Sequence, residues 1–236
     1  KGSWQYKLSG ASSWSAISAS TGVVPLNSAA LLLGPTDSLR FVPNADANGT
    51  ASFRFRAWDG TTGTAGSSAN AQVVGGSTAF SAIDDSASIT INPVNDAPQI
   101  SKTGSDADAS SLSEANAGLS ASGTLTVSDV DGNNTVTAAV QSMVKAGIIT
   151  GLGSNDAALL GMLSVTPSTV LSSPATSASL TWAFNSGSEA FNYLSAGEQL
   201  TLTYTLKATD SAATPLNATT TVTITVTGSN DGPTIT

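Results

Sequence analysis

The sequence predicts an all-β protein made of two consecutive β-sandwiches. Apolar and polar residues alternate with period two in runs such as 199–210 and 219–228, which is the pattern of strands that bury one face. Thirteen of the 16 acidic residues are Asp, a residue that suits turns better than helix surfaces. A chain of 236 residues is long enough for two domains that each bury a core.

The first predicted domain covers residues 1–96. Stretches rich in Gly, Asn and Asp separate five alternating runs. The runs that predict its strands are 3–9, 14–18, 39–43, 51–59 and 86–92. Five strands are few for a Greek-key sandwich of the immunoglobulin type, so we expect this domain to be incomplete at its N-terminus and the sequence to be a segment of a longer protein.

The second predicted domain covers residues 97–236 and looks complete. Residues 154–163 predict one helical turn, with Asn155 or Asp156 as its N-cap. The alternating runs that predict its strands are 97–102, 123–129, 134–140, 178–184, 199–210 and 219–228. This domain is expected to form a Greek-key sandwich of its own.

A short phrase marks the end of each predicted domain. Asn95 and Asp96 precede a Pro by one residue, and Asn230 and Asp231 do the same 135 residues later. A repeat at this distance indicates a module boundary rather than a local turn. The phrase therefore predicts a linker with a role for its Asn and Asp.

The composition narrows the possible functions. A net charge of −8 argues against nucleic-acid binding, and no apolar run is long enough to cross a membrane. The chain has no His and no Cys, which removes the usual nucleophiles and the preferred zinc ligands. A carboxylate-pair glycosidase would have only Glu114, Glu189 and Glu198 to use. We therefore expect no enzymatic activity.

Several carboxylates are expected to converge at one end of the second sandwich. Asp129 and Asp131 follow one strand and Asp210 ends another, and both strands run toward the same end of an immunoglobulin-type sandwich. The linker residues Asn95 and Asp96 arrive at that end. Carboxylates that crowd together repel unless a cation lies between them, and Ca²⁺ prefers oxygen ligands. Ordinary turn chemistry is the alternative explanation of these residues.

Both domains resemble modules of giant bacterial surface proteins. The stretches "GTLTVSDVDG" and "TTVTITVTGSNDGP" resemble the VCBS repeat of large adhesins, and the resemblance covers most of residues 110–233. The first domain, through "LRFVPNADANG" and "ASITINPVNDAP", is similar to cadherin-like modules of the same calcium-dependent, RTX-type adhesins. The resemblance implies extracellular tandem repeats at the bacterial cell surface that Ca²⁺ rigidifies at their junctions. It also implies cadherin-like sandwiches.

The resemblance also assigns calcium ligands at three places. Asp46 of the first domain is expected to join Asn95, Asp96, Asp129, Asp131 and Asp210 at an interdomain site. Two half-sites are expected toward neighbouring modules. Asp59 belongs to the half-site toward the preceding module. The half-site toward the following module consists of Glu114, Glu198, Asn230 and Asp231.

The leading functional hypothesis is a calcium-rigidified extender of a giant adhesin that supports cell attachment and biofilm formation. Its partners are then the neighbouring modules of the same protein. One alternative is a module that binds a glycan or a protein, for which Trp4 and Trp14 are the available aromatic side chains. Another is a filament subunit in which a strand from another copy completes the first sandwich.

Overall fold

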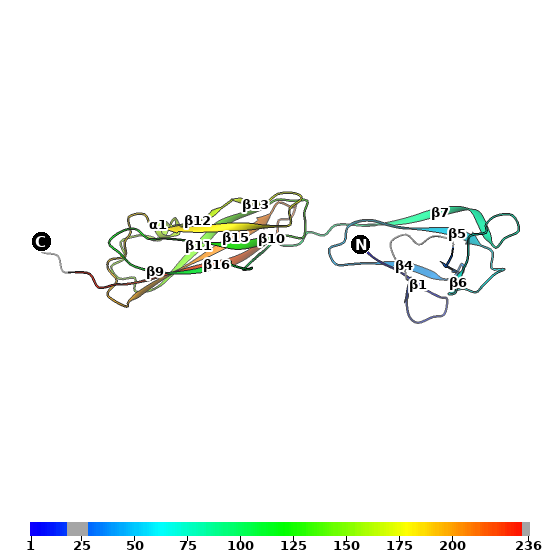
Figure 1. Cartoon of the computed structure of the whole chain (residues 1–236), viewed down its shortest axis with the longest axis horizontal. Helices are drawn as coiled ribbons and strands as arrows, with labels where there is room; N and C mark the ends of the chain where they lie inside the picture. Colours follow the sequence, from blue (N-terminus) through cyan, green and yellow to red (C-terminus); the bar gives the residue numbers. More distant parts are fainter. Residues whose placement is uncertain (18–27, 233–236) are drawn as a thin grey trace. The chain divides into compact units, whose positions relative to one another are not determined.

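The computed structural model describes residues 1–17 and 28–232 as an almost entirely β protein (Figure 1). The predicted all-β fold class is confirmed. The chain divides into two compact units, unit 1 from Lys1 to Val94 and unit 2 from Asn95 onward. The division falls before Asn95, so the two linker residues Asn95 and Asp96 belong to unit 2.

In its described residues, unit 1 contains seven strands in three small sheets. The strands are β1 (Gly2–Lys7), β2 (Ser15–Ala16), β3 (Ala30–Leu31), β4 (Ser38–Pro43), β5 (Gly49–Trp58), β6 (Ser68–Ala69) and β7 (Phe80–Ile91). The sheets are β2-β1-β4, β5-β7 and β3-β6, and every pairing is antiparallel. The prediction missed the two-residue strands β3 and β6, which carry no alternation to detect. It also began β7 at residue 86, six residues too late, because "FSAIDD" places two acids inside the strand.

Among the described residues of unit 1, few are buried together in a core. Leu32, Ala71 and Phe80 form its buried cluster. A second contact comes from Trp4 of β1, whose ring meets Phe41 at 5.0 Å and Phe53 of β5 at 4.8 Å between centroids. Trp4 therefore connects the β1 sheet to the β5-β7 pair through edge-to-face aromatic contacts.

Unit 2 is a sandwich of two sheets. One sheet has the order β12-β14-β10-β8 and the other β13-β11-β15-β16-β9. The elements are β8 (Gln99–Ser101), β9 (Ala109–Ser113), β10 (Ser120–Ser128), β11 (Val136–Gly147), α1 (Asp156–Leu160), β12 (Leu163–Thr166), β13 (Thr169–Leu171), β14 (Ser177–Asn185), β15 (Gln199–Asp210) and β16 (Asn217–Thr227). The predicted helical turn is present, and Asn155 is its N-cap because its side chain accepts a hydrogen bond from Ala158 N.

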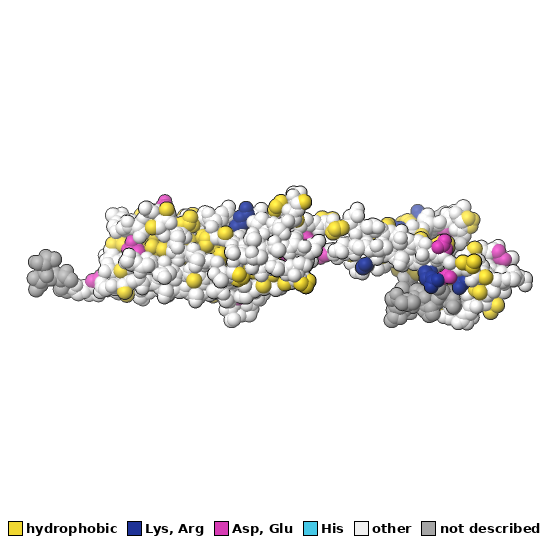
Figure 2. All heavy atoms as spheres, turned by 90° about the horizontal axis from the view of Figure 1, so that it is seen from above, with side chains coloured by type: hydrophobic (Ala, Val, Ile, Leu, Met, Phe, Trp, Pro, Cys, Tyr) yellow, Lys and Arg dark blue, Asp and Glu magenta, His cyan; other side chains and the backbone are white. Residues whose placement is uncertain are grey.

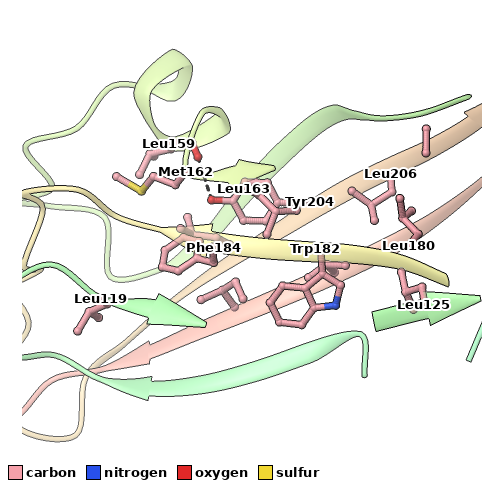
Figure 3. Close-up of a cluster of buried hydrophobic side chains, with 14 of the residues drawn as sticks. Leu119, Leu125, Leu159, Met162, Leu163, Leu180, Trp182, Phe184, Tyr204 and Leu206 are labelled. Carbon is pink, nitrogen blue, oxygen red and sulfur yellow. Dashed lines mark hydrogen bonds between the residues drawn. The ribbon is translucent and has the colours of Figure 1, made fainter. Parts of the chain in front are cut away.

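Both sheets of unit 2 face one continuous core. Along β15, every second side chain from Leu200 to Ala208 is fully buried, as the alternation in the sequence predicts. Figure 3 shows Trp182 and Phe184 of β14 beside Tyr204 of β15, whose hydroxyl donates to Leu159 O at 2.8 Å. The residues of this core thus hold the strand ends of unit 2 in fixed positions.

One glycine of unit 2 is required by the core. Gly123 of β10 pairs with Trp182 of β14, and a Cβ at Gly123 would lie 2.6 Å from the Trp182 ring. The indole nitrogen of Trp182 in turn donates to Ala107 O at 2.7 Å. Trp182 is fully buried in this core, whereas Trp58 of unit 1 is only partly buried.

The prediction missed three short strands of unit 2. Strand β9 runs parallel to β16 at the edge of its sheet, and its sequence "ASSLS" has a single large apolar residue. Strands β12 and β13 are four and three residues long, so alternation cannot be recognised in them. Strand β11 extends past the predicted end at residue 140, because a register shift between Val140 and Ser142 moves the alternation out of phase.

Candidate metal centre

Six polar residues of unit 2 gather where the linker meets the sandwich, and we call them the linker-end cluster. Two come from the linker, three from the segment that follows β10, and one is the last residue of β15. The members are Asn95, Asp96, Asp129, Asp131, Asn134 and Asp210. The structure thus brings together five of the six residues predicted for the interdomain site.

The backbone of the linker is anchored on the segment after β10. Asp96 N donates to Asp131 Oδ2 at 2.7 Å, and Asp131 N donates to Asp129 Oδ1 at 2.9 Å. Asp129 N donates to Thr176 O at 2.9 Å, which fixes the start of this segment against the residue that precedes β14. These hydrogen bonds form a chain from the sandwich to the linker.

Asp129 is the unusual member of the cluster. Its exposed fraction is only 4%, and its Oδ2 has no hydrogen-bond partner in the described part of the chain. A buried carboxylate oxygen normally has at least one donor, because removing the charge from water is costly. The arrangement therefore leaves one charged oxygen that requires an interaction from outside the chain.

Asn134 has a second oxygen of this kind, and the sequence analysis missed it. Its Nδ2 donates to Asn95 Oδ1 at 3.4 Å, whereas its own Oδ1 is buried without a partner among residues 1–17 and 28–232. Only its proximity to Asp129 and Asp131 in the sequence could have indicated a role. An Asn three residues after an Asp turn is too common to be informative.

Asp210 is also buried, but the chain satisfies it. Its exposed fraction is 4%. Its Oδ1 accepts from Ala212 N at 3.0 Å, and its Oδ2 accepts from Leu216 N and from Asn95 Nδ2, both at 3.0 Å. Asp210 thus closes the turn between β15 and β16 and also holds the first linker residue.

The electrostatics of the cluster follow from this crowding. Burial raises the pKa of Asp129 above its ordinary value, and the nearby charges of Asp131, Asp210 and Asp96 raise it further. A carboxyl group with a raised pKa binds a proton more tightly in the folded chain than in the unfolded one. Its contribution to stability is therefore lost as the pH rises through the window above its ordinary value of 3.8.

The donor set suits a hard cation. Every member of the linker-end cluster offers carboxylate or amide oxygens, which Ca²⁺ and Mg²⁺ prefer. Hydrogen bonds from the chain occupy half of these oxygens. Within the described ranges no three His, Cys, Asp or Glu side chains form a ready-made ligand group. The unpartnered oxygens of Asp129 and Asn134 are the two atoms whose chemistry fits a bound cation directly.

The two predicted ligands of unit 1 lie in exposed turns. Asp46 follows β4 and has a φ of 57°, a left-handed conformation that Asp tolerates better than most residues. Asp59 follows β5, and its Oδ1 accepts from Thr61 N at 2.9 Å and from Thr61 Oγ1 at 2.7 Å. These bonds lower the pKa of Asp59. Their roles toward a cation stay predictions.

At the opposite end of unit 2, the chain itself satisfies Glu114. This residue is 3% exposed, and its Oε1 accepts from Ser229 N at 3.1 Å and from Ser229 Oγ at 2.7 Å. With its amide nitrogen turned toward Glu114, Asn192 donates to Oε2 at 3.1 Å. We call Glu114, Asn192 and Ser229 the exit clasp, because they hold the chain where it leaves β16.

The other predicted ligands at this end are not held in the same way. Glu198 is half-buried, and its Oε2 accepts from Ser195 N at 2.8 Å within its own turn. Asn230 and Asp231 are exposed. Gly228 lies against the Glu198 turn so closely that a Cβ would be 2.3 Å from Ser195 O. The path of the chain at this end is thus determined by direct packing and hydrogen bonds.

Comparisons with known proteins return only structural similarity. No protein-family model and no curated protein matches the chain. A PapD-like domain of human CEP192 (ASH/PapD-like domain 7) is 8% identical at a TM-score of 0.36, covering 61% of this chain and 92% of that one.

No helix in the described part of the chain is long and apolar enough to cross a membrane.

Two bacterial structures are similar at the same level. The periplasmic chaperone SfaE is 11% identical at a TM-score of 0.30, covering 59% of each chain. The CooA pilin subunit from enterotoxigenic Escherichia coli is 13% identical at a TM-score of 0.32, covering 58% of this chain and all of that one. Similarity at TM-scores this low supports no statement about function. The all-β fold class rests on the strands of this chain.

The exit clasp predicts that Glu114 stabilises unit 2 without a metal ion. Replacing Glu114 by Ala leaves the Ser229 donors without their acceptor, which should lower the free energy of unfolding of unit 2 by about 1.5–3 kcal/mol. The loss should be equal in calcium and in chelator. Thermal unfolding measures the stability, and hydrogen exchange at the Ser229 amide measures the local opening.

The Glu114→Gln variant is the matched control, because it keeps an acceptor oxygen for Ser229 and should recover most of the stability. The opposite pattern would show Glu114 to be a ligand of the half-site predicted from the sequence. In that pattern, Glu114→Ala weakens calcium binding and leaves the stability in chelator unchanged.

Proposed function

We propose that the chain comprises two consecutive extender modules of a large extracellular bacterial adhesin, of the VCBS and cadherin-like kinds. The linker-end cluster holds a Ca²⁺ ion in this proposal, and the ion stiffens the junction. The chain then acts as part of a stalk that carries a distant binding region in cell attachment and biofilm formation. The proposal assigns no reaction to either unit.

One observation carries the calcium part of the proposal. The Asp129 carboxylate is almost fully buried, and one of its oxygens lacks a donor in the described residues. Three further carboxylates act on it, those of Asp131, Asp210 and Asp96. Like charges in such proximity destabilise one another by on the order of 1 kcal/mol or more per pair at effective protein dielectrics. A bound divalent cation would offset this repulsion, because it attracts each of the carboxylates.

Each member of the cluster has a distinct task in this proposal. Asp129 and Asn134 contribute the oxygens that lack donors, and Asp131 links the cluster to the linker through Asp96 N. Asp210 positions Asn95, because its Oδ2 accepts a hydrogen bond from Asn95 Nδ2. Asp46 of unit 1 is proposed to add a ligand from the preceding module. When bound, Ca²⁺ supplies the positive charge that draws these groups together.

The expected affinity follows from the class of site. Extracellular calcium modules bind with dissociation constants of about 0.1–1 mM. At a calcium concentration a hundredfold above the dissociation constant, one site adds about 2.7 kcal/mol to the stability of the bound state. That is a large fraction of the total stability of a domain of this size.

A second candidate function is a filament subunit completed by a strand of another copy. In the described residues, β5 and β7 pair only with each other, so each has a free edge. Apolar side chains on this pair are exposed, with exposed fractions of 44% for Phe55 and 83% for Ile83. An edge of this kind is a template for strand addition.

Sedimentation tests the filament candidate. It predicts association that grows with protein concentration and is abolished by a Pro at Ser88 of β7, which removes one donor of the edge. The exposed Ser13→Pro change, outside every strand, is the control. A chain that stays monomeric at all concentrations would rule the candidate out.

The calcium proposal predicts a reversal of stability for Asp129→Asn. In chelator, this change removes the unpartnered buried charge and keeps the acceptor for Asp131 N, so unit 2 should become more stable by about 1–3 kcal/mol. In calcium, the variant loses a ligand and should be less stable than the original chain. Thermal unfolding at both calcium levels measures the two differences.

Asp85→Asn is the matched control, since it removes the same charge from an exposed position of unit 1 that belongs to no predicted calcium site, and it should shift neither curve of unit 2. If calcium leaves the melting temperature of the original chain unchanged, the calcium site is wrong. If Asp129→Asn destabilises unit 2 in chelator, the carboxylate has a structural role in the turn and the argument from its burial fails.

A further inference from the structure

The positive charges of the chain are concentrated in unit 1. Five of the eight Lys and Arg residues lie there with five acidic residues, whereas unit 2 has three cations and 11 acidic residues. Unit 1 is therefore neutral overall, and unit 2 carries the whole net charge of −8. The face seen in Figure 2 shows Lys and Arg side chains gathered on unit 1. Unit 1 is thus the part of the chain in which an anion meets the least repulsion.

Two of these cations share one tryptophan ring. The guanidinium carbon of Arg40 lies 4.2 Å from the centroid of Trp14, and Lys7 Nζ lies 5.5 Å from it. Arg40 pairs with Gln5 across β4 and β1, and Lys7 lies two residues further along β1, so all three belong to one face of this sheet. Both distances are within the range of cation–π attraction.

The guanidinium of Arg40 is held in a fixed orientation. Its Nε and Nη2 both donate to Gln5 Oε1, at 2.8 and 2.6 Å. An Arg side chain has five N–H donors, so these two bonds leave three, of which two point in parallel along the edge formed by Nη1 and Nη2. This edge is the one that recognises a carboxylate with two parallel hydrogen bonds.

Neither cation has a carboxylate partner in the described part of the chain. The ion pairs of the described residues are Arg54–Asp84, Lys102–Asp108 and Lys145–Asp156, and none includes Lys7 or Arg40. Asp37, which ends the turn before β4, accepts instead from Ser9 N and Gly34 N, both at 2.7 Å. Two adjacent and oriented cations without a carboxylate partner are unusual in a chain with twice as many acids as bases.

We propose that Arg40, Lys7 and Trp14 form a binding subsite for the carboxylate groups of an acidic polysaccharide. The free edge of Arg40 binds one carboxylate through two hydrogen bonds, and Lys7 adds a second positive charge. The part of the Trp14 ring that these two cations leave exposed packs against the apolar face of the sugar. The subsite lies wholly in unit 1 and does not depend on the calcium proposal. It gives the chain a binding function in addition to that of an extender.

The aromatic ring favours a sugar over an acidic protein surface. A purely electrostatic contact would need only the two cations, and it would bind any polyanion with a strong dependence on salt. The partly exposed Trp14 ring beneath the oriented guanidinium adds apolar surface to a directional donor pair, which is the composition of small-ligand sites. The two possibilities differ in what the neutral sugar backbone contributes.

Calorimetric titration of the whole chain with an oligogalacturonate tests the proposal. The titration is carried out in chelator, so that calcium bridges between the sugar and unit 2 cannot contribute. We expect binding that Arg40→Gln weakens at least tenfold and that Arg40→Lys, which keeps the charge and loses the fork, weakens to a similar extent. Lys207→Gln removes the same charge from unit 2 and should leave the affinity unchanged.

Two further ligands distinguish the sources of affinity. The methyl-esterified oligogalacturonate has the same sugar rings without the charges and should not bind measurably. A polyglutamate peptide supplies carboxylates without sugar and should bind at least tenfold more weakly than the oligogalacturonate. Equal binding of the two polyanions would overturn the assignment to a sugar. Absence of oligogalacturonate binding, or equal losses for Arg40→Gln and Lys207→Gln, would overturn the subsite itself.

Discussion

The charge of Asp129 is the constraint on which the account of unit 2 depends. The strand pairing of β10 with β14 ends at Ser128, so the next residue is forced into the edge of the core, where 4% of it remains exposed. Its Oδ1 orders the following turn, while its Oδ2 has no donor within the described residues. In our proposal a cation compensates this oxygen at neutral pH, because the neighbouring carboxylates would attract it as well.

The two ends of unit 2 solve a similar problem in different ways. Each end buries a carboxylate beside a connecting segment, Asp129 at the linker and Glu114 at the exit. Ser229 and Asn192 satisfy Glu114 completely, so this end is ordered by the chain alone. At the linker end, Asp129 Oδ2 has no donor within the described residues, and this is the end at which the ion of our proposal would act.

The sequence predicts the long elements of this protein better than the short ones. Period-two alternation identifies β15 and β16 because both bury every second residue in a large core, whereas β12 and β13 are too short to show a period. At the candidate site, topology predicts that Asp129, Asp131 and Asp210 meet. It cannot predict which oxygen lacks a donor, since that depends on the turn geometry. Asn134 was missed for the same reason.

Small-angle scattering of the whole chain with calcium and with excess chelator tests the central claim most directly. If the linker-end cluster binds an ion that orders Asn95 and Asp96, the calcium form should scatter as one rigid, extended particle. The chelated form should then scatter as a flexible ensemble with a smaller mean dimension, and Asp129→Asn should behave like the chelated form at both calcium levels. Superimposable scattering curves for the original chain in the two conditions would contradict the claim and reduce the cluster to a set of turn-forming residues.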